Sequence, residues 1–196
     1  MPRRSPAFLL SAATVLAAAM MLTACTTPEP TPTSPAPSAG SETPTPTAEP
    51  PASAPPATST PVDIACDALI PAQTMYDFNP NFSLLNSWTP SSGSAAADAA
   101  AADGVACRWQ NDTSGEVIDV SVASFDTATL DHLASETYAH STMVPTYGGD
   151  EAYFEVDGNV GEAVVFDGSY WVVVSSSYFL EPGDAEPIVA SVLEAL

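Results

Sequence analysis

Residues 26–61 decide how much of this 196-residue chain can build a core. Twelve of these 36 residues are proline, fourteen carry a hydroxyl group and none is aromatic. A segment of this composition buries too little apolar surface to offset the entropy lost on folding, so we expect it to stay disordered. The core must come from residues 62–196, which hold fifteen of the sixteen aromatic side chains and have the length of one domain.

The first 24 residues have the layout of an export signal. Arg3 and Arg4 precede an apolar run, Ala7 to Leu22, which is shorter than the ~20 residues that a membrane-spanning helix needs. The following Leu22-Thr23-Ala24-Cys25 resembles the cleavage site of bacterial lipoprotein signals. The resemblance implies that the thiol of Cys25 receives a diacylglycerol and that cleavage leaves this cysteine as the new N-terminus. The alternative is a plain secretory signal with an incidental cysteine.

With this signal, residues 25–61 are predicted to form a lipidated end followed by a stalk. Proline-rich chains favour polyproline II, whose rise of ~3.1 Å per residue gives a reach on the order of 100 Å. We therefore expect a protein anchored by lipid to the outer face of the cell membrane, with a domain at residues 62–196 held away from the membrane. A docking site for a proline-recognition module and O-glycosylation of the threonines are alternative uses of the same segment.

The strongly negative charge of the chain disfavours anionic partners. The chain has a formal net charge of -21 and no lysine, and after the signal its only arginine is Arg108. Nucleic acids and anionic lipid head groups are poor partners, because binding them requires Lys and Arg to neutralise phosphate charge. Cations, basic peptides and cationic polymers are tolerated electrostatically, although an acidic surface is also a common route to solubility.

Two further cysteines, Cys66 and Cys107, remain when Cys25 is committed to lipid. In an oxidising compartment outside the membrane, such a pair predicts a disulfide. It would tie the first helix to the first strand. A metal-thiolate site is not expected, because the chain has neither a Cys-x-x-Cys motif nor neighbouring histidine ligands.

Hydrophobic periodicity predicts the order of the elements. Asp126 is positioned to cap a helix, and the run Tyr170 to Val174 is apolar on both faces, as in a central strand. Ile118, Val120 and Val122 alternate inward, with Asp119 and Ser121 outward. The predicted elements are helix 71–77, strands 105–110 and 116–124, helix 127–138, strands 151–156, 162–166 and 170–178, and a closing helix 187–196 after a break at Pro182-Gly183.

This order, α-β-β-α-β-β-β-α, predicts an α+β fold in which helices pack on a five-stranded, mainly antiparallel sheet with one disulfide. Glycines in Asp157-Gly158-Asn159 and Asp167-Gly168-Ser169 predict tight hairpin turns between the last three strands. Residues 79–104 are expected to form a surface excursion, in which the alanines of 95–102 are compatible with a short helix.

Several of these residues together resemble a family. Cys66-Asp67-Ala68-Leu69 leads into a short helix, Cys107-Arg108-Trp109 lies on a predicted strand, and a helix closes the chain. This pattern resembles small actinobacterial cell-envelope lipoproteins that are grouped under a domain of unknown function. The resemblance covers most of residues 62–196 but not the segment 79–104. It implies an extracytoplasmic, lipid-anchored, noncatalytic domain with no assigned ligand.

Motifs for catalysis, metals or cofactors do not emerge from the sequence. His132 and His140 lack the spacing of a zinc pair, and His132 with Glu136 is typical of a solvated contact on a helix. No Gly-x-Ser-x-Gly elbow occurs, and clustered acids lack the spacing of a calcium loop. We expect no enzyme activity, no cofactor and no metal.

Aromatic side chains and the lone arginine give the candidate binding surface. Tyr76, Phe78, Phe82 and Trp88 surround one predicted loop, and Arg108 could orient an anionic ligand. The alternatives are that the rings cover the sheet or the disulfide, and that Arg108 pairs with an acid. The sequence thus predicts a binding domain for a cell-wall polymer or another envelope protein, with an accessory solute-binding component of a transport system as the second hypothesis.

Overall fold

The computed structural model describes residues 57–196. The predicted signal peptide, the lipidation site at Cys25 and the stalk up to residue 56 lie outside the described residues. Between residues 57 and 196, no helix is long and apolar enough to cross a membrane. The fold starts earlier than the expected Val62, because Ser59 and Thr60 already pair with another strand of the sheet.

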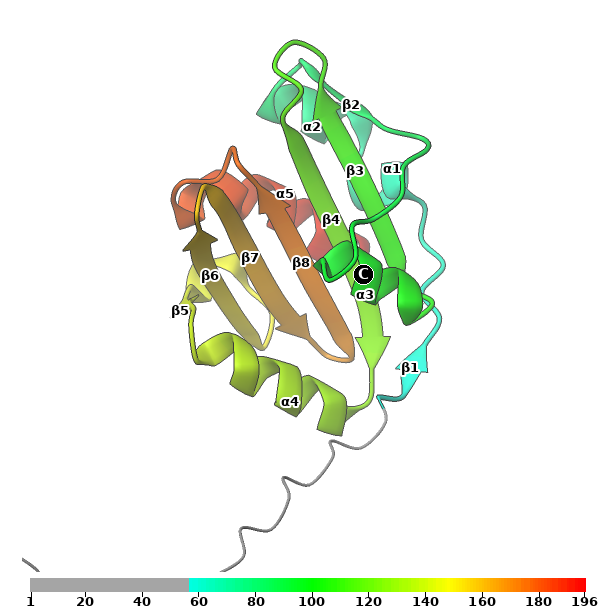
Figure 1. Ribbon diagram of the computed structural model, residues 1–196, viewed down its shortest axis with the longest axis vertical. Coiled ribbons are helices and arrows are strands. Elements are labelled where there is room, and N and C mark those ends of the chain that lie inside the picture. The colour runs from blue at the N-terminus through cyan, green and yellow to red at the C-terminus, as the bar shows by residue number, and fades with distance from the viewer. Residues whose placement is uncertain (1–56) are drawn as a thin grey trace, which may run out of the picture. The chain divides into compact units, whose positions relative to one another are not determined.

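An antiparallel sheet forms the centre of the domain (Figure 1). Its long strands are β3 (Val105–Asn111), β4 (Val117–Phe125), β6 (Glu151–Asp157), β7 (Val160–Asp167) and β8 (Tyr170–Ser176). The prediction of an α+β fold with an antiparallel sheet is confirmed. The predicted number of five strands is wrong, because the sheet has eight.

The three additional strands are β1 (Ser59–Thr60), β2 (Phe82–Leu84) and β5 (Thr142–Met143). With two or three residues each, they are too short to show an alternation of apolar and polar side chains. The order across the sheet is β2-β3-β4-β8-β7-β6-β5, and β1 pairs with β4. The predicted element order therefore holds for the long elements and omits the short ones.

Tight turns connect the last three strands as predicted. Asp157 pairs with Val160, and Asp167 pairs with Tyr170, so each hairpin has a two-residue loop. The first loop residue is glycine in both, with φ of 62° at Gly158 and 58° at Gly168. Glycine adopts this left-handed conformation without the steric cost that a side chain would bring.

Helices cover both faces of the sheet (Figure 1). The first face carries α1 (Cys66–Leu69), α2 (Ala72–Phe78) and α5 (Pro182–Ala195), and the second face carries α3 (Ala95–Ala101) and α4 (Thr127–Tyr138). A short 3-10 helix, η1 (Pro145–Tyr147), follows β5. Helix α4 has the predicted bounds, and the carboxylate of Asp126 accepts a hydrogen bond from the backbone N–H of Thr129.

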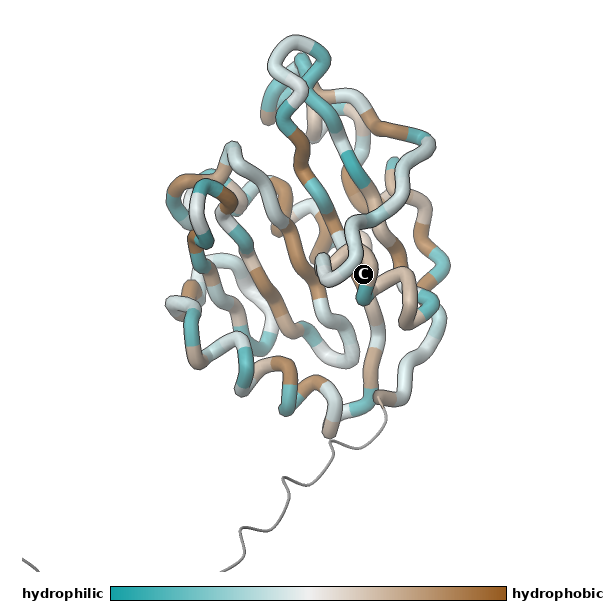
Figure 2. The backbone as a smooth tube through the Cα atoms, in the orientation of Figure 1, coloured by the Kyte–Doolittle hydropathy of each residue, from teal (hydrophilic) through white to brown (hydrophobic). Residues whose placement is uncertain are grey.

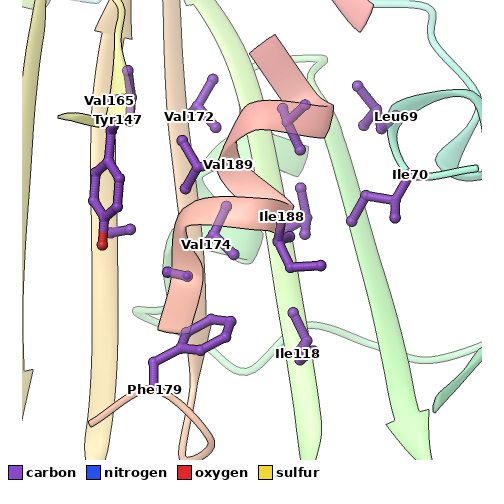
Figure 3. Close-up of a cluster of buried hydrophobic side chains, with 14 of the residues drawn as sticks. Leu69, Ile70, Ile118, Tyr147, Val165, Val172, Val174, Phe179, Ile188 and Val189 are labelled. Carbon is purple, nitrogen blue, oxygen red and sulfur yellow. The ribbon is translucent and has the colours of Figure 1, made fainter. Parts of the chain in front are cut away.

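The first face of the sheet is a continuous apolar core. Ile188 and Val189 of α5 lie against Val172 and Val174 of β8, and all four are fully buried (Figure 3). Burying a side chain of this size stabilises the fold by about 1.5–3 kcal/mol before the entropy cost is counted. Figure 2 shows the same concentration of hydrophobic residues along the central strands.

Helix α5 begins five residues earlier than predicted. The sequence Pro182-Gly183 was expected to break the chain, yet Pro182 is the first residue of the helix. Proline fits this position, because the first N–H groups of a helix have no partner within the helix. The side chains of Glu181 and Asp184 complete a reciprocal capping box, which fixes the start.

On the second face, side chains that were expected to point to solvent are covered. Ser121 is only 1% exposed, because α3 lies over this face of β3 and β4. The alanine-rich segment forms α3, in which Ala96 and Ala99 are buried. Their small side chains let the helix lie close to β3 and β4.

The predicted disulfide is confirmed: Cys66 in α1 is bonded to Cys107 in β3. The two cysteines are 41 residues apart in the sequence, and Cys107 is buried in the core of the first face. The bond therefore links the N-terminal part of the domain covalently to the sheet.

We predict that the double variant Cys66→Ala/Cys107→Ala unfolds with a free energy lower by about 3–4 kcal/mol, as expected for closure of a loop of this length. Urea denaturation of the variant and of the wild-type chain with and without reductant measures the difference. Reduction should lower the stability of the wild type alone. Equal stability of all four samples would contradict the predicted contribution.

Candidate functional site

A row of polar side chains crosses the sheet on the second face. The strand register pairs Arg108 with Asp119, Asp119 with Ser175, Ser175 with Glu162, and Glu162 with Glu155. Residues that pair directly across neighbouring strands share a face of the sheet, so these five side chains lie in one line. We call them the polar row.

Arg108 and Asp119 form the fixed end of the polar row. The guanidinium donates two hydrogen bonds to the carboxylate, from Nε to Oδ1 at 2.6 Å and from Nη2 to Oδ2 at 2.5 Å. Both side chains are largely shielded, with exposed fractions of 24% and 17%. The hydrogen bonds to Asp119 raise the pKa of Arg108 above its already high ordinary value. Such a two-pronged contact holds both groups in a defined orientation.

Trp88 covers this ion pair. The guanidinium carbon of Arg108 lies 4.0 Å from the centroid of the indole ring, which is a cation–π geometry. Trp88 belongs to residues 85–94, which we call the strap, and the strap leads from β2 across the second face to α3 (Figure 1). The backbone N–H of Leu85 donates to the carbonyl of Arg108 at 2.8 Å. Arg108 therefore fixes the strap through both its backbone and its side chain.

A pocket of about 420 Å³ lies between the end of the strap, the start of α3 and the polar row. We call it the groove. Its sheet side is formed by Asp119, Glu162 and Ser175 of the polar row together with Val160 and Trp171, and its helix side includes Asp98. The groove thus combines hydrogen-bond acceptors with an aromatic side chain on a rigid sheet.

Glu162 is the most perturbed group of the groove. Its burial in the sheet, together with the charge of Glu155 on the neighbouring strand, raises the pKa of Glu162 to about 6. The sequence offers only one Lys or Arg after residue 4, and Arg108 is already paired with Asp119. The negative charge of Glu162 is therefore poorly compensated within the domain.

The structure separates the aromatic residues that the sequence placed around one loop. Tyr76 is 61% exposed on α2, whereas Phe82 is buried in the core of the first face. Phe78 packs against Phe82 with ring centroids 6.2 Å apart. Trp88 lies on the second face, over Arg108. Of the predicted surface residues, only Trp88 and Arg108 come together near the groove, because β2 carries the chain across the edge of the sheet.

Glu162 and Ser175 were not identified as site residues from the sequence. One signal for them was present: the two-residue turn at Gly168-Ser169 fixes the register of β7 and β8, which pairs Glu162 with Ser175. Their alignment with Asp119 also requires the pairing of β8 with β4, for which no local signal exists. The polar row therefore appears only once the strand order is known.

Other titratable residues do not gather into a site. The Nδ1 atom of His132 lies 3.3 Å from a carboxylate oxygen of Glu136, and both side chains are more than half exposed on α4. Within residues 57–196, no group of three or more His, Cys, Asp and Glu side chains is placed to hold a metal ion.

Comparison of the chain with protein-family models, with curated protein sequences and with solved structures gave no match. The interpretation of the site accordingly rests on its geometry and chemistry.

We predict that Glu162→Gln stabilises the domain at neutral pH. Because the pKa of Glu162 in the folded state is raised to about 6, ionisation costs stability as the pH rises through the range between the ordinary glutamate pKa and 6. The variant should gain up to about 2 kcal/mol at pH 8 and no more than about 0.3 kcal/mol at pH 4, where the carboxyl group is mostly protonated in both states. Urea denaturation at the two pH values measures this.

Glu155→Gln is the matched control for the charge contribution. It should lower the pKa of Glu162 without removing its carboxyl group, because the repulsion between the two strands is lost. A gain from Glu162→Gln that is the same at pH 4 and pH 8 would show that ionisation is not the cause.

Proposed function

We propose that this chain is a lipid-anchored lipoprotein on the outer face of the bacterial cell membrane, which presents a noncatalytic binding domain to the envelope. Three sequence features support the anchor: the apolar run after two arginines, the Leu22-Thr23-Ala24-Cys25 site and the proline-rich segment that follows. The Cys-x-x-Leu and Cys-x-Trp patterns, which resemble small actinobacterial envelope lipoproteins, support the same assignment.

The groove is proposed as the ligand site, and the polar row is the observation that carries this proposal. Binding sites combine a concave surface with a few polar groups that are fixed before the ligand arrives. Here the bidentate pair of Arg108 and Asp119 is held beneath Trp88, and the partly buried Glu162 lacks a compensating charge. Such a surface orients a ligand without rearranging.

The chemistry of the groove favours ligands that donate hydrogen bonds. Asp98, Asp119 and Glu162 supply acceptor oxygens, and Trp171 supplies an aromatic edge. Hydroxyl and amino groups of a cell-wall polymer fit this set, and so do basic side chains of an envelope protein. A polymer is the preferred ligand, because repeated polar groups can follow the polar row from strand to strand.

Binding without catalysis is the form of activity that these residues support. The polar row contains carboxylates and a serine, and the residues that line the groove include no histidine or cysteine, so they do not form a Ser-His or Cys-His pair. A role as an accessory solute-binding component is less favoured, since such receptors close two lobes around a ligand and residues 57–196 form one sheet with its helices.

Cys25→Ser tests the anchor. In a bacterial host that processes lipoproteins, the wild-type chain should gain the mass of the lipid and partition into detergent, whereas the variant should not. Thr27→Ser, which lies just outside the cleavage site, is the matched control and should behave as the wild type. Partitioning of Cys25→Ser into detergent with an unchanged lipid mass would contradict lipidation at Cys25.

A photoreactive residue at Val160 tests the groove. Val160 lines the groove and is exposed, whereas Ala190 is exposed on α5, so it serves as the control on the first face. In intact envelopes, irradiation should attach wall polymer to the Val160 variant at least about fivefold more than to the Ala190 variant, because fixed polar groups recruit ligand only to the groove. Equal attachment from both positions would contradict the groove as the site while leaving the anchor unaffected.

A further inference from the structure

The outer edge of β3 contains backbone that the short strand β2 leaves uncovered. β2 pairs with β3 only as far as Leu84, which lies opposite Trp109, and the N–H of Leu85 then donates to the carbonyl of Arg108. Beyond this point the strap turns away from the edge, toward α3. The first half of β3 therefore has no neighbouring strand on this side among the described residues.

Ala106 is the residue whose backbone faces this open edge. In an antiparallel ladder, successive residues direct their N–H and C=O groups to opposite sides. The N–H of Asn111 donates to Glu116 on the β4 side, so Arg108 and Ala106 direct their backbone groups to the outer side. Arg108 uses its carbonyl for Leu85, whereas no pairing of Ala106 at this edge occurs within residues 57–196.

A pocket of about 430 Å³ lies at this position. We call it the edge slot. Cys66 and Asp67 of α1 line one side, residues 85–88 of the strap line another, and Leu84 and Ala106 belong to the sheet side. Figure 1 shows α1 and the strap on the side of β3 that is away from β4. The open backbone of β3 is thus the inner wall of a narrow hollow and not a flat exposed edge.

We propose that the edge slot binds a short extended peptide segment of another protein, which adds to the sheet beside β3. A backbone donor and acceptor on one strand edge can pair with the backbone of an extended peptide. Pockets on the protein that receive alternate side chains of the peptide then give specificity. The slot volume lies within the range of about 300–1,000 Å³ that is usual for ligand sites. It accommodates only a few residues, at a rise of about 3.3 Å each.

The lining of the edge slot defines the chemistry of the peptide. Leu84 and Trp88 offer apolar contact, and Asp67 adds a carboxylate. The only guanidinium nearby, that of Arg108, is held by Asp119. A peptide that carries an apolar residue next to Lys or Arg therefore complements the slot, and an acidic peptide does not.

Two other occupants fit less well. Residues 26–56 of this chain contain eleven prolines, which lack the N–H that strand addition requires. A second copy of the chain would have to bring β3 edge to β3 edge, and the α1 and strap walls on either side of the slot oppose the approach of another walled sheet. A single extended segment enters without this conflict.

The test uses the purified full chain and a displayed library of proline-free heptapeptides. Selected peptides should be rich in Lys or Arg beside an apolar residue. In the free chain, the amide of Ala106 should exchange its hydrogen faster than that of Cys107, because the N–H of Cys107 is directed toward β4 and that of Ala106 toward the open edge. A bound peptide should slow the exchange of Ala106 by about tenfold or more.

Ala106→Pro removes the N–H at the open edge, and Ala106→Ser keeps it in a side chain of similar size. We expect the proline variant to bind the selected peptide about tenfold more weakly and the serine variant to bind within about twofold of the wild type. A peptide methylated at the pairing amide provides a second measurement that leaves the protein unchanged, and it should lose affinity to the same extent. Asp67→Asn should lower the affinity for the basic peptides at low salt, where the attraction between charges is least screened.

Three results would overturn the proposal. The first is a selection that yields no peptide whose affinity depends on Ala106→Pro or on methylation of the peptide. The second is strong protection of the Ala106 amide in the dilute free chain, which would mean that the chain itself fills the slot. The third is protection that increases with protein concentration, which would identify a second copy as the occupant. None of these results bears on the groove, which shares no lining residue with the edge slot.

Discussion

Seven residue pairs join β8 to β4, from Ile118 with Ser176 to Ser124 with Tyr170. The β3–β4 hairpin and the β6–β7–β8 meander are separate segments of the chain. Within residues 57–196, the β4–β8 ladder is the only strand pairing that joins the hairpin to the meander. Closing the long connection between β4 and β8 costs chain entropy, which must be offset by burial. Val172 and Val174 on one face and Val173 on the other are almost completely buried, so both faces contribute to this offset. The register that results also aligns Asp119 with Ser175.

The parts of the fold that were predictable carry their own local signals. Asp126 with the apolar spacing after it gave the bounds of α4, and the glycine turns gave the hairpins of β6, β7 and β8. Short strands such as β2 lack such a signal, because their formation depends on a neighbour that is already in place. The predicted start of α5 was wrong because a proline can mark a break in the chain but also fits the first position of a helix. At Pro182 the capping side chains of Glu181 and Asp184 favour the helix.

The candidate site shows the same division between local and long-range information. Arg108 and Trp88 stood out in the sequence as rare residue types, but their contact depends on the path of the strap. Glu162 was inconspicuous among many acids, and its perturbation arises from strands that pair around it. The first face of the sheet carries a continuous apolar core, and its buried polar side chains, such as Ser124 and Ser176, lie near the ends of the strands. The second face instead carries the polar row across the middle of its strands. The uncompensated charge of Glu162 in that row lowers stability, and this is what directs attention to the second face.

The disulfide also determines how the domain responds to mechanical load on its N-terminal end. A pull on the chain before residue 57 would act first on β1, which is held to β4 by only two residue pairs. Once these pairs and the hydrogen bond from the N–H of Val62 to the carbonyl of Asp103 have separated, the load would reach Cys66 and pass through a covalent bond into β3, within the sheet. Only the residues before Cys66 would peel away under moderate tension, while β3, the strap and the polar row would keep their positions. A domain built in this way yields a short length of chain under force before its binding surfaces are disturbed.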